Sequence, residues 1–98
     1  MIELNENNFE QETSSGLVLL DFYADWCGPC RMLAPTLAQL TGIKVAKVNV
    51  DSNQALAAQY QVSSIPKLVF LKDGQVVDET VGVQTKETLQ AKVNALGG

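Results

Sequence analysis

Two cysteines, the only ones in the chain, lie in the pentapeptide Trp26-Cys27-Gly28-Pro29-Cys30. Two thiols at this spacing can close into a small disulfide ring and open again, and their reduction potential against the surroundings decides which state holds. A run of residues that suits a helix follows Cys30. One thiol is therefore expected at a helix N-terminus, where unpaired N–H groups and the helix dipole favour a negatively charged sulfur.

A structural disulfide and a metal site are the other interpretations of this pair. A disulfide between such close residues closes a tiny loop, so it removes little entropy from the unfolded chain and stabilises weakly. A zinc site wants four ligands, commonly Cys or His, whereas this chain has two cysteines and no histidine. Only a metal or iron–sulfur cluster shared between two chains would fit, so we expect no metal and no separate cofactor.

Nine short elements that alternate along the chain are expected to position the thiols. The apolar run at 17–23 is typical of a strand buried on both faces, and Asp73-Gly74 predicts a hairpin turn. The predicted strands are 2–4, 17–23, 45–50, 67–71 and 75–81. The first predicted helix runs from an Asn5 cap to about Thr13, and the second from 28 to 41. The third follows an Asp51 cap with Gln54 as its capping-box partner, and the fourth runs from a Thr85 cap to Leu96.

The order of these elements, βαβαβαββα, predicts an α/β fold. Alternating strands and helices need a mostly parallel sheet with helices on both faces, and the hairpin adds an antiparallel edge. Ninety-eight residues leave room for one small domain, residues 1–98.

This arrangement predicts different roles for the two thiols. Cys27 is expected to be exposed at the end of a strand-to-helix turn, and Cys30 to be shielded one turn into the helix. The Cys27 thiolate would open the disulfide of a partner to form a mixed disulfide. Cys30 would then attack Cys27 and release the reduced partner.

Several segments, in the same order, resemble the thioredoxin family. Segment 21–35 is similar to its active-site segment, as are 45–51, 64–66, 72–74 and 81–82 to other parts of the family pattern. Cys-X-X-Cys alone is shared by zinc sites and many redox folds, but Trp-Cys-Gly-Pro-Cys with an upstream Asp and a downstream Ile-Pro is highly specific. The resemblance covers essentially the whole chain and implies a thioredoxin fold, with a central mixed five-stranded sheet flanked by four helices.

The resemblance also implies a set of site residues. Asp21 matches a buried carboxylate below the disulfide, and burial would raise its pKa so that it accepts the proton of Cys30. Lys47 matches a lysine that modulates that pKa, and Pro66 matches a cis-proline facing the disulfide. A shallow apolar groove for extended protein substrates would be formed by Trp26, Gly28, Pro29, Val50, Ile65, Pro66, Val81, Gly82 and Val83.

Three features depart from the family pattern. Tyr23 stands where the family often has Trp, so an aromatic platform remains. Lys67 follows the cis-proline position, where its charge would favour the Cys27 thiolate, select acidic substrates or point to solvent. The segment from Pro35 to Lys47 is a few residues short, which predicts a second helix truncated at its C-terminal end, away from the cysteines.

The leading hypothesis is a thiol–disulfide oxidoreductase that reduces protein disulfides. The resemblance implies disulfide-containing protein substrates and, as electron source, thioredoxin reductase, an NADPH-dependent flavoprotein. The alternative is a thioredoxin-like binding subunit that uses the groove around Trp26 and Pro66.

Composition narrows the location and the partners. A net charge of −4 without a basic block argues against nucleic-acid binding. No apolar stretch approaches the roughly 18 residues of a membrane span, and residues 1–6 lack the features of a secretory signal. We expect a cytoplasmic monomer that uses no membrane.

Overall fold

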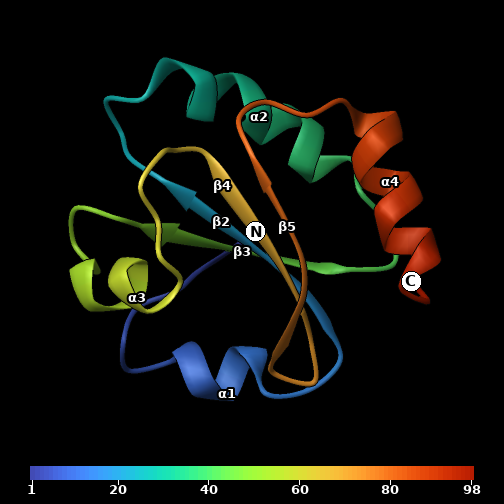
Figure 1. Cartoon of the computed structure of the whole chain (residues 1–98), viewed down its shortest axis with the longest axis horizontal. Helices are drawn as coiled ribbons and strands as arrows, with labels where there is room; N and C mark the ends of the chain where they lie inside the picture. The colour runs from blue at the N-terminus through green and yellow to red at the C-terminus, as the bar shows by residue number, and fades with distance from the viewer.

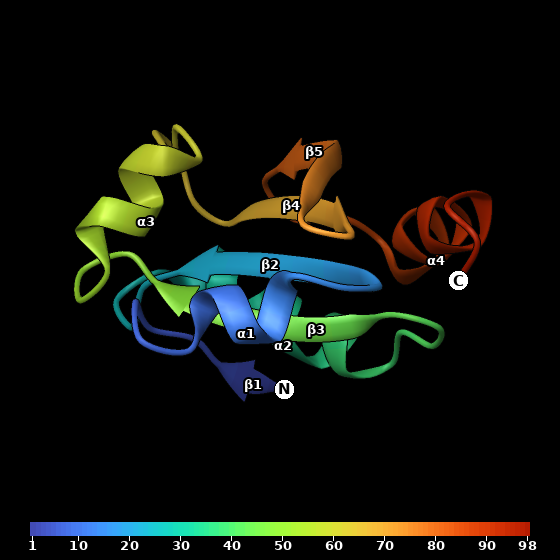
Figure 2. The same ribbon diagram turned by 90° about the horizontal axis from the view of Figure 1, so that it is seen from below.

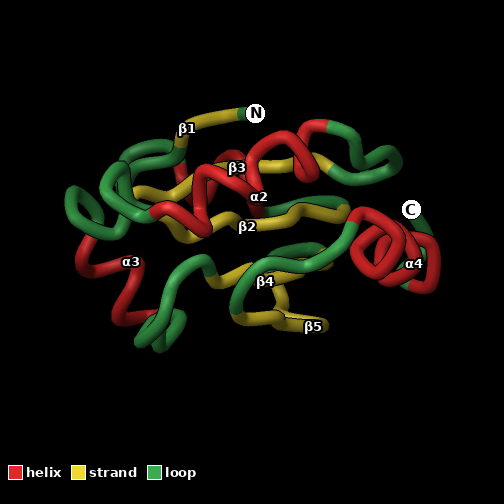
Figure 3. Tube along the Cα trace, turned by 90° about the horizontal axis from the view of Figure 1, so that it is seen from above, coloured by secondary structure: helices red, strands yellow, loops and turns green.

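A mixed sheet of five strands forms the centre of the computed structural model, which describes residues 1–98. The strands are β1 (Ile2–Glu3), β2 (Leu17–Tyr23), β3 (Lys44–Asn49), β4 (Lys67–Lys72) and β5 (Gln75–Val81). They lie side by side in the order β1-β3-β2-β4-β5 (Figure 1, Figure 3). β3 pairs in parallel with β1 and β2, whereas β4 pairs antiparallel with β2 and β5. The predicted α/β fold with an antiparallel hairpin edge is confirmed.

Four helices cover the two faces of the sheet. They are α1 (Phe9–Thr13), α2 (Gly28–Ala38), α3 (Gln54–Gln59) and α4 (Lys86–Ala95). α1 and α3 lie on one face, and α2 and α4 on the other (Figure 2, Figure 3). No helix is both long enough and apolar enough to cross a membrane.

β2 is buried on both faces, as its continuous apolar sequence predicts. Leu20 and Phe22 belong to the core beneath α1 and α3, whereas Leu19 belongs to the core beneath α2 and α4. Side chains alternate between the faces of a strand, so Asp21 points to the same face as Leu19. The Asp21 carboxylate therefore lies on the same face of the sheet as α2, the helix that contains the two cysteines.

Three predicted helix boundaries are wrong. The first helix begins at Phe9 rather than directly after Asn5, although the Asn5 side chain accepts the backbone N–H groups of Asn7 and Asn8, as an N-cap does, in the turn that leads into the helix. α2 ends at Ala38 rather than at 41. α3 begins at Gln54 without a side-chain cap, and Asp51 lies outside it.

The hairpin and the last helix start as predicted. Asp73 and Gly74 both have positive φ, 50° and 82°, and they connect the paired ends of β4 and β5. Positive φ at both central residues is the requirement of a type I′ turn. Thr85 caps α4, because its hydroxyl accepts the N–H of Thr88 at 3.1 Å.

Candidate active site

Cys27 and Cys30 form a disulfide at the N-terminus of α2. Cys27 is the N-cap residue, in extended conformation, and its Sγ accepts the N–H of Cys30 at 3.2 Å. Pro29 stands in the first turn, where a missing N–H costs nothing. The Cys27 sulfur therefore lies at the positive end of the helix dipole, which favours a thiolate when the disulfide is open.

The predicted exposure of Cys27 is wrong, because both cysteines are buried. Cys27 is 4% exposed and Cys30 is 5% exposed. Ala24 packs against both, and Tyr23, Val50 and Ile65 lie around them in the same cluster. These neighbours come from three separate loops and strands, so the local strand-to-helix pattern does not show that they cover Cys27.

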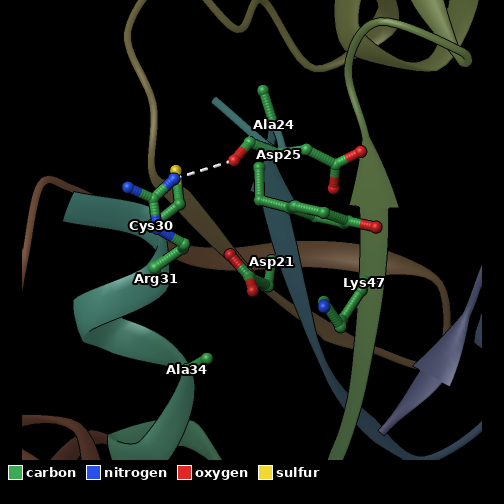
Figure 4. Close-up of a pocket in the computed structure, with 8 residues that line it drawn as sticks. Asp21, Ala24, Asp25, Cys30, Arg31, Ala34 and Lys47 are labelled. Carbon is green, nitrogen blue, oxygen red and sulfur yellow. Dashed lines mark hydrogen bonds between the residues drawn. The ribbon is translucent and has the colours of Figure 1, made fainter. Parts of the chain in front are cut away.

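Asp21 lies below the disulfide and is 2% exposed. Its Oδ1 atom has no hydrogen-bond partner. Asp21, Cys30 and Lys47 line one cavity of about 140 Å³, with Asp21 between α2 and β3 (Figure 4). Burial raises the pKa of Asp21 to about 6, against the opposing charge of Lys47 and with a smaller contribution from Glu3. A carboxyl group with such a pKa can take up and return a proton near neutral pH.

Lys47 stands beside Asp21 but does not pair with it. The two residues are opposite one another in the parallel register of β2 and β3. None of the three ion pairs in the molecule includes Lys47. Its Nζ instead lies 4.2 Å from the centre of the Tyr23 ring, a cation–π contact. Tyr23 donates its hydroxyl to Glu3 Oε2 at 2.8 Å, and burial and this bond raise its pKa to about 12.

The predicted groove residues range from exposed to buried, and two of them, Val50 and Ile65, pack against the cysteines. The Ile65–Pro66 peptide bond is cis, and the Pro66 carbonyl accepts the N–H of Gly82 at 2.8 Å, which brings β4 and the segment after β5 together. Trp26 is 69% exposed. Val81, Val83 and Pro29 are also exposed, Gly28, Val50, Ile65 and Gly82 are half-buried, and Pro66 is buried.

Two exposed residues next to predicted groove residues were not predicted from the sequence. Asp51 accepts the indole N–H of Trp26 at 2.9 Å, which explains why it is not a helix cap. Met32 is 71% exposed on the first part of α2. The sequence signal for Met32 was its place three residues after Pro29, on the same side of the helix.

Lys67 does not act near the disulfide or point to solvent, as the sequence alternatives had it. It is 9% exposed, and its Nζ donates to the Tyr60 carbonyl and pairs with Glu79, each at 2.8 Å. It faces the side of the sheet that carries α1 and α3, because its strand neighbour Leu68 faces α2 and α4. Its charge is used within the fold.

Comparison with known proteins agrees with this geometry. The thioredoxin family model matches residues 1–95. The thioredoxin of Bacillus subtilis (strain 168) is 48% identical over 96% of this chain and 95% of its own length, and that of Chlamydia caviae is 45% identical over 93% of both. A solved mutant thioredoxin from Halobacterium salinarum NRC-1 superimposes with a TM-score of 0.88 and 41% identity, over 96% of this chain and 88% of that one.

No group of three or more His, Cys, Asp or Glu side chains is arranged to hold a metal ion. The reactive group of this site is the disulfide at the N-terminus of α2. The chain belongs to the thioredoxin family of thiol–disulfide oxidoreductases.

Proposed function

We propose that the protein reduces disulfides of other proteins, with Cys27 as the attacking thiol and Cys30 as the resolving thiol. The observation that carries this assignment is the position of the two sulfurs. Cys27 Sγ caps α2, where the dipole favours its thiolate. Cys30 lines the cavity that holds the unpartnered Asp21 carboxyl.

The first step is attack on the substrate. The Cys27 thiolate forms a bond to one sulfur of the substrate disulfide, and the other sulfur leaves as a thiolate. Because Cys27 is only 4% exposed, the substrate must pack directly against the surface around Cys27 to bring its disulfide to the Cys27 sulfur. The exposed side chains of Trp26 and Val83 offer apolar contacts for such a substrate, and the Ile65 backbone, next to the cis peptide bond, offers hydrogen bonds to an extended substrate segment by strand addition.

The second step is resolution by Cys30. Asp21 in its ionised form accepts the proton of the Cys30 thiol, and the resulting thiolate attacks Cys27 Sγ. The Cys27–Cys30 disulfide forms, and the substrate leaves with its second sulfur reduced and takes up a proton. The protein dithiol has then given two electrons, and Lys47 modulates the proton affinity of Asp21 through its charge.

The oxidised protein needs an electron donor to return to the dithiol. We propose an NADPH-dependent flavoprotein, a thioredoxin reductase, for this step, and a monomer in the cytoplasm that binds no cofactor of its own. The family relationship supports a reductase partner. Consumption of NADPH in a mixture of the two proteins and a disulfide substrate tests the assignment.

Turnover of a disulfide-linked protein such as insulin tests the roles of the two thiols. Cys27→Ser should abolish turnover, and Cys30→Ser should stop it at a covalent complex with the substrate that dithiothreitol releases. Gln39→Ala is a matched control on the same helix, because Gln39 is exposed at the end of α2 opposite the cysteines and lines no part of the cavity. Wild-type turnover in both cysteine variants would contradict the mechanism.

The exposed Trp26 also suits a binding subunit that uses the groove without redox chemistry. The Cys30→Ser variant separates the two functions. Partners that remain attached until reductant is added indicate exchange chemistry. Partners that bind equally to a variant with both cysteines replaced indicate docking.

A further inference from the structure

Three charged side chains cross the sheet in one row beside the disulfide. Glu3 of β1 is in register with Lys47 of β3, and Lys47 is in register with Asp21 of β2. Neighbours in register point to the same face of a sheet. Lys47 therefore stands between two carboxylates, one exposed at the edge and one buried at the centre.

Tyr23 connects the outer carboxylate to the lysine. Its hydroxyl donates to Glu3 Oε2 at 2.8 Å, and its ring lies 4.2 Å from Lys47 Nζ. The quadrupole of an aromatic ring attracts a cation over its face. The bond to Glu3 holds the ring at one end, so the ammonium has a fixed place that does not depend on Asp21.

The consequence appears at Asp21, whose Oδ1 has no partner although a lysine is its neighbour in register. A full ion pair with Lys47 would favour the ionised carboxylate and weaken its hold on a proton. Lys47 makes no such pair. The ring and Glu3 compete with Asp21 for the ammonium.

We propose that Glu3 and Tyr23 are positioning residues for the proton transfer at Asp21, because together they hold the Lys47 ammonium on the tyrosine ring and out of an ion pair with the Asp21 carboxylate. This inference rests on the proposed role of Asp21 as proton acceptor. The inference adds Glu3, which lies on the edge strand and far in sequence from the cysteines, to the residues that affect proton transfer at the site.

No other group that faces Asp21 takes the place of Lys47 as a cation beside its carboxylate. The α2 side contributes Cys30 and Arg31, and the loop before it contributes Asp25. The Arg31 guanidinium donates to the Asp25 carbonyl oxygen at 2.8 Å (Figure 4). On the β4 side, the residue in register with Asp21 is the apolar Leu68.

Glu3→Gln is the first test, because it removes the outer charge but keeps the size and an acceptor for Tyr23. The pKa of Asp21 should fall by about one pH unit, because an ammonium released toward a carboxyl lowers its pKa by about 1–3 units, whereas loss of the direct field of a unit charge about 10 Å away in water accounts for only about 0.3 unit. Carbon-13 NMR of the Asp21 carboxyl measures this shift in the oxidised protein. The pH profile of the resolving rate should move to lower pH by the same amount.

Tyr23→Phe keeps the ring but loses the bond to Glu3, and it should lower the pKa of Asp21 as well. The double variant, Glu3→Gln with Tyr23→Phe, should shift the pKa of Asp21 no further than the larger of the two single changes, because both residues act through the same contact with Lys47. Glu6→Gln is the matched control, since Glu6 is an exposed carboxylate that lines a cavity against α1 and α3. An unchanged Asp21 titration in Glu3→Gln would overturn the proposal.

A Lys47→Met background separates positioning from a direct field. If Glu3 acts through Lys47, most of the Glu3→Gln shift should disappear in this background; if more than half of it persists, the positioning role is wrong. The NMR titration also distinguishes this inference from the proposed function. A wild-type resolving rate in Asp21→Asn would refute the role of Asp21 as proton acceptor. The effect of Glu3→Gln on the Asp21 titration would still be observed in proteins that keep Asp21.

Discussion

At the scale of single residues, the site depends on a carboxyl group that is buried without a partner. The place of Asp21 inside an apolar run predicts a buried side chain. In the structure Asp21 is 2% exposed, and its Oδ1 atom has no hydrogen-bond partner. Burial without a partner disfavours the charged form. Asp21 therefore makes the folded state less stable at neutral pH while giving the site a group that exchanges protons there.

Asp21→Asn should make the protein more stable at neutral pH. The pKa of the carboxyl is 3.8 in the reference state and about 6 in the folded state, so the folded protein binds more protons between these values. The free energy of unfolding of the wild type should fall as pH rises from about 4 to about 6 and stay level above. The variant should lack this fall and gain up to about 3 kcal/mol at pH 7.

Urea denaturation of both proteins between pH 4 and pH 8 measures this difference. Asp25→Asn, which changes an exposed carboxylate in the next loop, is the matched control and should keep the fall. Asp21→Ala checks that the gain does not depend on the amide of Asn. A variant that is less stable than the wild type at pH 7 would show that the Asp21 carboxylate has partners in the folded state.

Two residues show where sequence reasoning ends at this scale. The sequence predicts an exposed Cys27 and allows three roles for Lys67, and in both cases the deciding neighbours lie on other segments of the chain. Val50 and Ile65 pack beside the cysteines, and Tyr60 and Glu79 bind the ammonium of Lys67. A residue's type gives its chemistry, but its partners depend on tertiary contacts that no local pattern records.

At the scale of elements, the sequence predicted every strand and helix but not every end. Apolar runs and turn residues are strong local signals, which is why the 17–23 strand and the Asp73-Gly74 hairpin agree with the structure. Caps are weaker signals, since an Asn or Asp side chain has several possible partners. Asp51 binds the Trp26 indole and does not cap the predicted helix, whereas Asn5 makes the expected cap bonds but in a turn that precedes the helix.

Substitutions at Gly74 should rank by their tolerance of positive φ. Gly74 has φ of 82°, and a Cβ there would meet no atom closer than 3.9 Å, so the cost comes from the backbone alone. Asn tolerates this conformation better than other side chains, and β-branched residues tolerate it least. We expect Gly74→Ala to lower the free energy of unfolding by about 1–2 kcal/mol, with Gly74→Asn above it and Gly74→Val below it.

Thermal or urea denaturation of the three variants at pH 7 gives this order. Insulin reduction should continue in all three, because the hairpin turn lies at the opposite end of β4 from Pro66. Equal stability of the Asn and Val variants would mean that the turn has relaxed to another type.

At the scale of the whole molecule, the sheet brings together residues that the sequence keeps apart. Glu3, Asp21 and Lys47 lie on three strands that become neighbours only in the order β1-β3-β2. The alternation of elements predicts a parallel sheet, but register is set by packing on both faces and by turn geometry. The row of charges could not be read from the sequence for that reason, although each member was visible as a residue type.

The two cores share the same strands, so we propose that the chain unfolds as one domain. Leu68 and Leu71, both on β4 and both fully buried, belong to opposite cores, Leu68 under α2 and α4 and Leu71 under α1 and α3. Leu68→Ala and Leu71→Ala should each lower the free energy of unfolding by about 2–5 kcal/mol, the usual cost of emptying a buried leucine site.

The number of steps in the unfolding transition tests for one domain more directly than the loss of stability does. Because loosening either core disturbs β4, and β4 pairs with the central strand β2, each variant should unfold in one step. Far-ultraviolet circular dichroism reports the whole backbone, and hydrogen exchange at the hydrogen-bonded amides of Leu89 in α4 and Ala57 in α3 reports the two faces separately. All three should give the same free energy of unfolding in each variant. A Leu68→Ala protein in which α4 exchanges well before α3 would show that the faces unfold independently, and the chain would then hold two cooperative units on one sheet.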